Sequence, residues 1–202
     1  MGKLTSLTQE EMDNVIYDAR FGDLESLTEI FTKEVEPSVI KTIKDEYSLS
    51  TPFHMAAANG HIEVLKFLLS LIPDEDERKN ILNLKNDSGN TALHWAAYNG
   101  HLEIVQMLCD SGSDPFIRNN YNHDVFFEAS NNEQEEVDDY LLQKYGNIVE
   151  KGIDEDDTNG NHEAVEEKDQ IKFSEGTEIS KVTEEDKKAV AQMTEQTQKL
   201  SV

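Results

Sequence analysis

The chain has 202 residues, of which 42 are acidic and 18 are basic, so its formal net charge is −24. Nucleic acids would repel such a polyanion, so the charge argues against direct DNA or RNA binding and favours a positively charged protein as partner. Hydrophobic residues make up 37%, which is low for a fully globular chain, so part of the sequence should stay outside any core.

Cys109 is the only cysteine, which excludes an internal disulfide and fits a reducing compartment. The N-terminal sequence MGKLTSLTQEEMDN lacks the apolar centre of a signal peptide. No apolar run reaches the roughly 18 residues of a membrane span, and the longest, Val64 to Ile72, contains Lys66 and Ser70. We therefore expect neither secretion nor membrane insertion.

Residues 8–44 predict a pair of helices. Thr8 and Glu11 have the T-x-x-E spacing of a capping box, which marks a helix start. Gly22-Asp23 is a turn signal between the two helices. The apolar residues on either side of it fall at helical spacing. They are Val15, Ile16, Ala19, Leu24, Leu27, Ile30 and Phe31.

Two later segments repeat each other: TPFHMAAANGHIEVLKFLL over 51–69 and TALHWAAYNGHLEIVQMLC over 91–109. Both contain T-x-x-H-x-A-A followed by N-G-H-x-E. This pattern resembles the ankyrin repeat, a unit of about 33 residues with the signature T-P-L-H-x-A. The resemblance implies an all-α solenoid of about four helix-turn-helix units with short hairpin loops, in which 8–44 is the N-terminal capping repeat.

The recurring polar and glycine residues are expected to be structural. The threonines suit the N-cap of the first helix, and the histidines should bond back toward the preceding loop. The glycines should end that helix in the left-handed conformation, and the alanine pairs are small because neighbouring units stack closely. These structural residues are Thr51, His54, Gly60, Thr91, His94 and Gly100.

The two typical repeats are assigned to 45–85 and 86–118. Thr51 and Thr91 are 40 residues apart rather than 33, and the extra length falls between Ile72 and Leu84. There the sequence PDEDERKN predicts a polar loop extension. Such an insertion either contacts the partner or is an idle surface loop, and the sequence leaves both readings open.

Residues 119–146 are interpreted as a degenerate C-terminal capping repeat. Asp124 lies 33 residues after Thr91 and can cap the helix in its place. Phe127 replaces the histidine, Glu133 replaces the glycine, and Gly146 can end the second helix. Loss of consensus is expected at the end of an array, because a terminal repeat needs one polar face.

The pattern stops in residues 147–202, which hold 15 acidic and 7 basic residues. Their sparse apolar residues cannot offset the entropy of ordering, so we expect an acidic and mostly disordered tail. No catalytic or phosphate-binding motif, paired cysteine or metal-ligand spacing is present in the sequence. We therefore expect no enzyme activity, cofactor or metal.

A partner should bind the concave side of the stack, which is made of hairpin tips and the exposed side of each first helix. Trp95 has two readings of equal weight, contact with a partner or packing under the next repeat. The predicted contact residues are Tyr47, Ser48, Ser50, Ala58, Asn59, Asp87, Ser88, Asn90, Trp95, Tyr98, Asn99, Asn120, Tyr121, His123, Asn131 and Asn132.

Further stretches resemble one group of ankyrin proteins more closely. They are YDAR at 17–20 with GDL at 22–24, HMAAANGHIE at 54–63, GNTALHWA at 89–96, DPFIRN at 114–119 and EGTEISKVT at 175–183. The chain resembles the small fungal ankyrin-repeat chaperones of a small-subunit ribosomal protein, the KH-domain protein of the 40S head. The tail match is the most discriminating, because ankyrin proteins in general share no such tail.

The resemblance implies a function: holding that newly made basic protein soluble and off RNA until ribosome assembly. It also implies travel between cytoplasm and nucleus. We expect a monomer that forms a 1:1 complex with the client, and the net charge favours an acidic concave surface that covers the client's cationic helices. The alternative is an ankyrin-type inhibitor that masks a transcription factor or a kinase.

Overall fold

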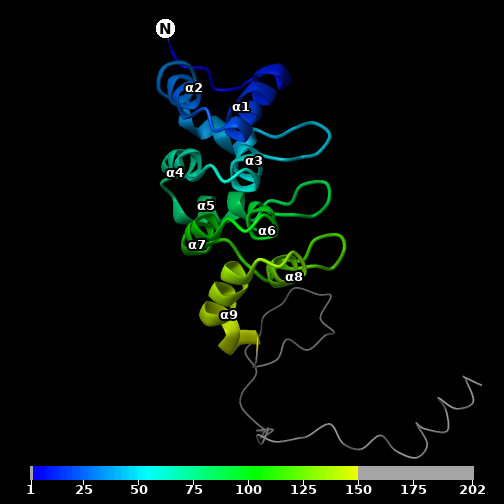
Figure 1. Cartoon of the computed structure of the whole chain (residues 1–202). Coiled ribbons are helices and arrows are strands. Elements are labelled where there is room, and N and C mark those ends of the chain that lie inside the picture. The colour runs from blue at the N-terminus through cyan, green and yellow to red at the C-terminus, as the bar shows by residue number, and fades with distance from the viewer. Residues whose placement is uncertain (1, 150–202) are drawn as a thin grey trace, which may run out of the picture. The chain divides into compact units, whose positions relative to one another are not determined.

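The computed structural model describes residues 2–149, which form a stack of helix pairs (Figure 1). The pairs are α1 (Gln9–Phe21) with α2 (Leu24–Glu29), α3 (Pro52–Ala58) with α4 (Ile62–Ser70), α6 (Ala92–Tyr98) with α7 (Leu102–Asp110), and α8 (Val125–Asn131) with α9 (Glu135–Val149). Within the described residues the only extended pairing is one parallel bridge between Leu4 and Val35. The predicted all-α ankyrin solenoid is confirmed.

The helices form two columns. The first helices of the pairs, α1, α3, α6 and α8, contact one another in chain order, while α2 contacts α4 and α7 contacts α9 in the second column. The hairpin loops that precede α3, α6 and α8 project on the side of the first helices (Figure 1). This arrangement defines an inner face, which consists of the first helices and the hairpin tips.

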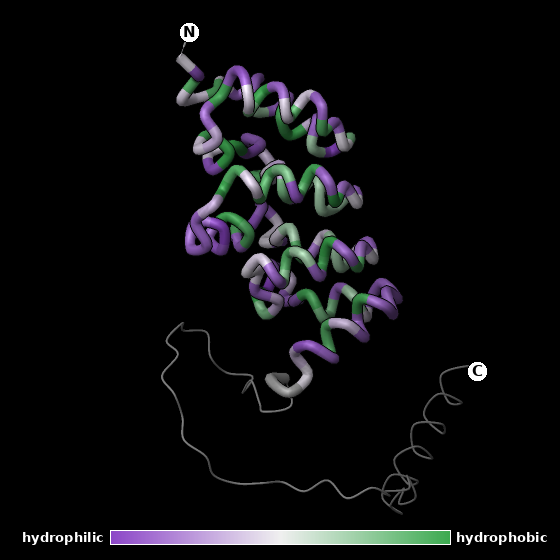
Figure 2. The backbone as a smooth tube through the Cα atoms, turned by 90° about the vertical axis from the view of Figure 1, so that its left-hand side faces the viewer, coloured by the Kyte–Doolittle hydropathy of each residue, from purple (hydrophilic) through white to green (hydrophobic). Residues whose placement is uncertain are grey.

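Alternating hydrophobic and hydrophilic stretches along each helix reflect a core that lies between the layers (Figure 2). The alanine pairs 56–57 and 96–97 are completely buried, so neighbouring first helices approach closely. In the second column Leu65, Leu68, Val105 and Leu108 are completely buried as well. Burying each such side chain stabilises the fold by about 1.5–3 kcal/mol, so stacking is the main source of stability.

Side-chain caps fix where the outermost units begin. The Thr8 backbone N–H donates to Glu11 Oε2 at 2.8 Å, and the Glu11 N–H donates to Thr8 Oγ1 at 3.4 Å, as the capping box predicted. Asp124 accepts from the Phe127 N–H at 3.0 Å at the start of α8. A helix cap of this kind contributes about 1 kcal/mol.

The predicted loop extension after Ile72 is wrong, because this segment forms a helix, α5 (Glu75–Leu82). Asp74 caps it by accepting from the Glu77 N–H at 2.9 Å. Acidic residues in its first turn interact favourably with the positive end of the helix dipole. Ile81 and Leu82 at its other end are buried. Two shorter turns, a π-helical Ile30–Glu34 and a 3₁₀ Pro37–Thr42, follow α2.

The prediction that Gly146 ends the last helix is also wrong, because α9 continues through it to Val149. Aromatic packing holds the preceding turn: the Tyr145 ring meets Phe116 with centroids 5.9 Å apart and Phe126 at 6.4 Å. This packing can offset the roughly 1 kcal/mol cost of a glycine inside a helix. Residues 150–202, which include nearly all of the predicted tail, lie outside the described residues.

Candidate partner-binding surface

Two histidines join the hairpins before α6 and α8 to the units that precede them. His54 Nδ1 accepts from the Thr51 N–H at 3.1 Å, and its Nε2 lies 3.0 Å from the Asn90 carbonyl oxygen. His94 repeats the arrangement, with its Nε2 3.2 Å from the His123 carbonyl oxygen. Our expectation of a bond back toward the preceding loop is therefore wrong for Nε2, which reaches forward to the following hairpin.

Burial keeps His54 in the neutral form that these bonds require. Removal from water lowers the pKa of His54 to about 4, and burial lowers the pKa of His94 as well. In a neutral ring that accepts at Nδ1, Nε2 carries the proton and donates to the carbonyl oxygen. Each of these histidines is therefore a structural hydrogen-bonding group and not a general base.

A second series of bonds runs back along the chain, from each second helix to the unit before. His61 Nε2 lies 2.9 Å from the Arg20 carbonyl oxygen, and His101 Nε2 lies 3.2 Å from that of Ala58. Gln134 Nε2 donates to the Tyr98 carbonyl oxygen at 3.4 Å. Sequence reasoning missed Gln134, although aligning Glu133-Gln134 with the earlier Gly-His pairs would have indicated it.

The glycines that precede His61 and His101 allow this approach. Gly60 has φ +79° and Gly100 has φ +72°, both in the left-handed region. A Cβ on Gly60 would lie 3.0 Å from the His101 ring. Glycine at this position therefore serves both the backbone turn and the stacking of units.

Backbone bonds link neighbouring hairpin tips into one row. The Asp87 N–H donates to the Ser48 carbonyl oxygen at 2.9 Å, and the Asn120 N–H donates to that of Ser88 at 3.1 Å. Asn120 Nδ2 also donates to the Asp87 carbonyl oxygen at 2.9 Å. Any partner that contacts the tips therefore meets a continuous and pre-ordered edge.

Most predicted contact residues reach the surface of the inner face. The exposed ones are Tyr47, Asn59, Asp87, Tyr98, Asn99, Asn120, Tyr121 and Asn131, and the partly buried ones are Ser48, Ala58, Ser88, Asn90, Trp95, His123 and Asn132. Ser50 is only 3% exposed. It lies in the buried turn before α3, so it offers a partner little more than the small surface that lines a hollow on this face.

A hollow of about 350 Å³ lies between α1, α3 and α6 and is called the inner hollow below. Trp95 lines it and also packs edge-to-face on Tyr98, with centroids 5.9 Å apart. The ring is therefore partly packed and partly open to a partner. The complete lining is Arg20, Ser50, His54, Met55, Ala58, Asn59, Trp95 and Asn99.

The expected acidic lining is wrong for the inner hollow. Its lining includes no carboxylate and one cation, Arg20. Acidic residues lie instead on the hairpin tips, where Glu46 and Asp87 are exposed. At the base of the first tip, hydrogen bonds from the Ser48 and Tyr47 backbone N–H groups lower the pKa of Asp45, which stays ionised. These carboxylates therefore lie on the hairpins, which also carry the exposed cations Lys44, Lys85 and Arg118, and not in the inner hollow.

Three asparagines recur at the ends of the first helices. Asn59, Asn99 and Asn132 are the C-cap residues of α3, α6 and α8. Each Nδ2 donates to the carbonyl oxygen four residues earlier, at 2.8, 3.0 and 2.8 Å. Each side-chain oxygen can accept from a partner, and Asn59 and Asn132, which use one of their two Nδ2 hydrogens in these bonds, can also donate with the other.

Tyr17 and Phe21 of α1 were not predicted as contact residues. They are 60% and 61% exposed, and their ring centroids lie 4.4 Å apart. Large exposed apolar groups that cluster in this way mark interaction surfaces. Aligning Ala19 with Ala57 places Tyr17 opposite Met55, so the repeat register could have indicated it.

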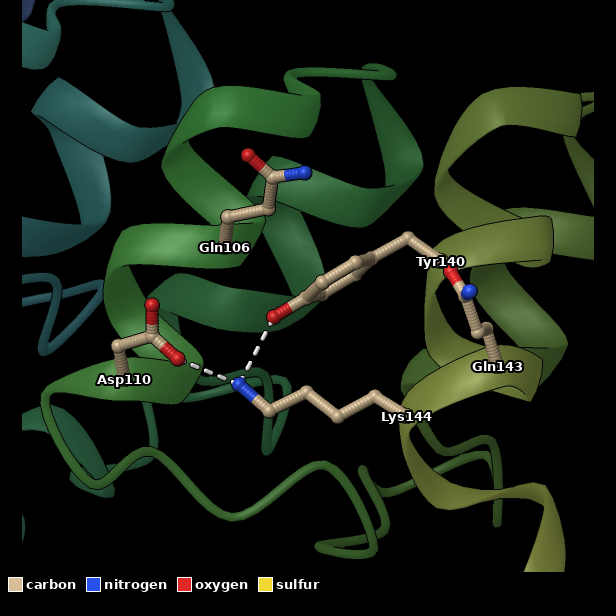
Figure 3. Close-up of a pocket in the computed structure, with 5 residues that line it drawn as sticks. All are labelled: Gln106, Asp110, Tyr140, Gln143 and Lys144. Atoms are coloured by element: carbon tan, nitrogen blue, oxygen red, sulfur yellow. Dashed lines mark hydrogen bonds and ion pairs between the residues drawn. The ribbon is translucent and has the colours of Figure 1, made fainter.

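A second hollow, the outer pocket, lies between α7 and α9 and measures about 300 Å³ (Figure 3). Lys144 Nζ donates to Asp110 Oδ1 at 2.5 Å and to the Tyr140 hydroxyl at 2.9 Å. Gln106 and Gln143 complete its lining. The charged groups pair with each other, so the outer pocket joins two helices and offers little to a ligand.

Cys109 is the one cysteine of the sequence. Cys109 is buried, and burial raises the pKa of its thiol, so it behaves as the packed small residue that the sequence predicted. Residues 2–149 contain no group of histidine, cysteine and acidic side chains placed to hold a metal. No helix in the same range is long and apolar enough to cross a bilayer.

Known proteins share both the sequence and this arrangement. A family profile for ankyrin repeats matches residues 15–119 and 55–159. The chain is 47% identical to the ankyrin repeat-containing protein YAR1 of Saccharomyces cerevisiae over 200 residues, which cover 97% of this chain and 95% of that protein. It is 35% identical to an ankyrin repeat-containing protein of Schizosaccharomyces pombe over 132 residues, 65% of this chain and 84% of the other.

A solved structure matches as well. The crystal structure of the yeast ribosomal protein Rps3 in complex with its chaperone Yar1 contains a chain with 49% sequence identity and a TM-score of 0.68. The match covers 69% of this chain and 96% of that one. Together with the stacked helix pairs and the recurring T-x-x-H bonds, these similarities show that the chain belongs to the ankyrin-repeat family.

Proposed function

We propose that this protein is a chaperone that binds a newly made ribosomal protein of the small subunit, the counterpart of Rps3, and keeps it soluble and off RNA until ribosome assembly. The observation that carries the proposal is the 47% identity to yeast YAR1 across 97% of the chain. In the crystal structure of the yeast complex, Rps3 is the protein bound by its chaperone Yar1.

The charge of the chain suits such a client. A ribosomal protein without its RNA is basic and binds polyanions at random, and a net charge of −24 attracts it over long distances. This attraction can accelerate encounter by about 10- to 1000-fold at low salt. Individual ion pairs at the exposed tips add only about 0–1 kcal/mol each, so most of the affinity should come from contacts on the inner face.

The proposal includes a 1:1 complex and a role without catalysis or cofactor. His54 and His94 are occupied by structural bonds, and the Cys109 thiol is buried and protonated. We assign the protein to the cytoplasm and the nucleus, since a client made in the first must reach assembling ribosomes in the second. The relation to the chaperone of Rps3 supports this function over an inhibitor of a transcription factor or kinase.

The test mixes the purified full chain with purified yeast Rps3. Size-exclusion chromatography with light scattering should give a 1:1 complex, and the chain should prevent Rps3 from precipitating with added RNA. An unrelated acidic protein of similar net charge is the control, because a generic polyanion would also delay precipitation. Absence of a complex, or equal protection by the control, would count against the proposal.

A further inference from the structure

The inner hollow has the chemistry of a site for one uncharged side chain. Three of its eight lining residues, Met55, Ala58 and Trp95, are apolar and come from α3 and α6, and the other five are polar. Ala58 is partly buried and has the smallest side chain of the three. Concave sites with apolar walls and a few polar groups at the edge are typical of binding sites.

Arg20 at the edge of the inner hollow argues against a cationic guest. It belongs to α1 and is the only charged side chain of the lining. A lysine or arginine of the client placed here would face a like charge, which costs up to several kcal/mol. The basic client suggested by the net charge must therefore place something other than its charges in this hollow.

The polar groups at the edge favour a peptide segment. Asn59 uses one of its two amide hydrogens within the protein, and Asn99 uses both, because its Nδ2 also donates to the Ala58 carbonyl oxygen at 3.1 Å. Their side-chain oxygens can accept from N–H groups of a client. The Arg20 guanidinium can in turn donate to a carbonyl oxygen of the same segment.

Given the proposed chaperone function, we propose that the inner hollow takes one apolar side chain of the ribosomal client, from a segment with lysine or arginine residues nearby. N–H groups of the segment bond to Asn59 and Asn99, and its cations meet the acidic hairpin tips at Glu46 and Asp87. The apolar guest is the specificity element, because any basic protein could satisfy the tips alone.

The test fills the inner hollow with a larger side chain of the chain itself. Ala58→Phe in the full chain should weaken binding of yeast Rps3 by at least about tenfold, the loss expected when an anchor contact is blocked. Gln106→Phe is the matched control, since it adds the same side chain at the outer pocket on the second column and should leave the affinity unchanged. Circular dichroism and thermal unfolding check that both variants stay folded.

A compensating substitution in Rps3 identifies the apolar side chain that enters the inner hollow. Apolar residues of Rps3 are replaced by alanine one at a time, and one replacement should restore binding to the Ala58→Phe chain while weakening binding to the wild type. Should Ala58→Phe fail to fold, the smaller Ala58→Val variant is used. In parallel, the wild-type chain labelled with 5-fluorotryptophan reports on Trp95, the only tryptophan, and its ¹⁹F resonance should shift when Rps3 binds.

The outcomes separate this inference from the proposed function. If the wild-type chain does not bind Rps3, the proposed function fails. If the wild type binds Rps3 but the filled variant binds equally well and the ¹⁹F resonance does not move, the inference about the hollow is overturned while the function stands. Equal losses in Ala58→Phe and Gln106→Phe would overturn it as well.

Discussion

His54 of one unit holds the hairpin of the next, because its Nε2 lies 3.0 Å from the carbonyl oxygen of Asn90, 36 residues along the chain. The bond lies beneath the surface that carries the predicted contact residues. It ties first helices and hairpin tips into one platform, so that a partner meets a surface that is ordered before binding. Ordering in advance lowers the entropic cost of association.

Replacing His54 by alanine should lower the free energy of unfolding by about 2–4 kcal/mol, because the Thr51 N–H and the Asn90 carbonyl oxygen lose their buried partner. Urea unfolding of the full chain measures this loss. His123→Ala is the control: its side chain is partly exposed and its carbonyl oxygen, the group that pairs with His94, is kept. A similar loss in both variants would contradict the structural role of His54.

Stability should fall as the pH drops below about 6.5. The pKa of His54 is about 4 in the folded chain against 6.5 for an ordinary histidine. Between these values the unfolded chain binds a proton that the folded chain excludes, so stability decreases by up to about 1.4 kcal/mol per pH unit. His94, whose pKa burial also lowers, acts in the same direction.

Urea unfolding between pH 7 and pH 4.5 tests this dependence in the wild type and in His54→Gln. Glutamine does not titrate, so the variant should show a shallower dependence on pH. The carboxylates are the same in both proteins, and the comparison cancels their contribution. Equal slopes in the two proteins would contradict a pKa of His54 that is lower in the folded chain than in the unfolded chain.

Two glycines should respond in opposite ways to alanine. Gly60→Ala should destabilise the chain by about 1–2 kcal/mol, because φ is +79° and the new Cβ would lie 3.0 Å from the His101 ring. Gly146→Ala should raise stability by up to about 1 kcal/mol, since this residue is inside α9 and its Cβ would meet nothing within 4 Å. Thermal unfolding midpoints that move in the same direction would contradict this assignment.

The aromatic pair on α1 should contribute to client binding. Replacing Tyr17 and Phe21 together by serine should weaken the Rps3 complex by about tenfold with little change in stability, because both rings are mostly exposed. Leu142→Ser is the control, as Leu142 is 48% exposed but belongs to α9 in the second column. Isothermal titration calorimetry would detect the loss, and an unchanged affinity of the double variant would exclude the pair from the contact.

The repeat framework could be predicted because its signals are local. Thr51, His54 and Gly60 fall at fixed spacing, and each satisfies a bond or a backbone angle inside its own unit or with a neighbour. Helix α5 escaped prediction because only Ile81 and Leu82, at the end of a charged segment, pack in the core. Two buried residues are too few to produce a helical period.

The site was predictable in outline and not in its electrostatics. The repeat register located Asn59, Asn99 and Trp95, since equivalent positions in stacked units share a face. Net charge is a property of the whole chain and does not tell which surface carries it. The inner hollow, whose one charged lining residue is Arg20, therefore emerged only from the three-dimensional arrangement of α1, α3 and α6.

The account holds that long-range electrostatic attraction speeds the encounter with Rps3, while contacts in the inner hollow hold the complex together. The most direct test is to measure the kinetics of Rps3 binding to the full chain across a series of salt concentrations. The association rate constant should fall by about tenfold or more as salt rises from about 0.05 to 0.5 M, while the dissociation rate constant stays nearly constant. An association rate indifferent to salt, or a salt dependence carried mainly by dissociation, would contradict this division between the acidic tips and the inner hollow.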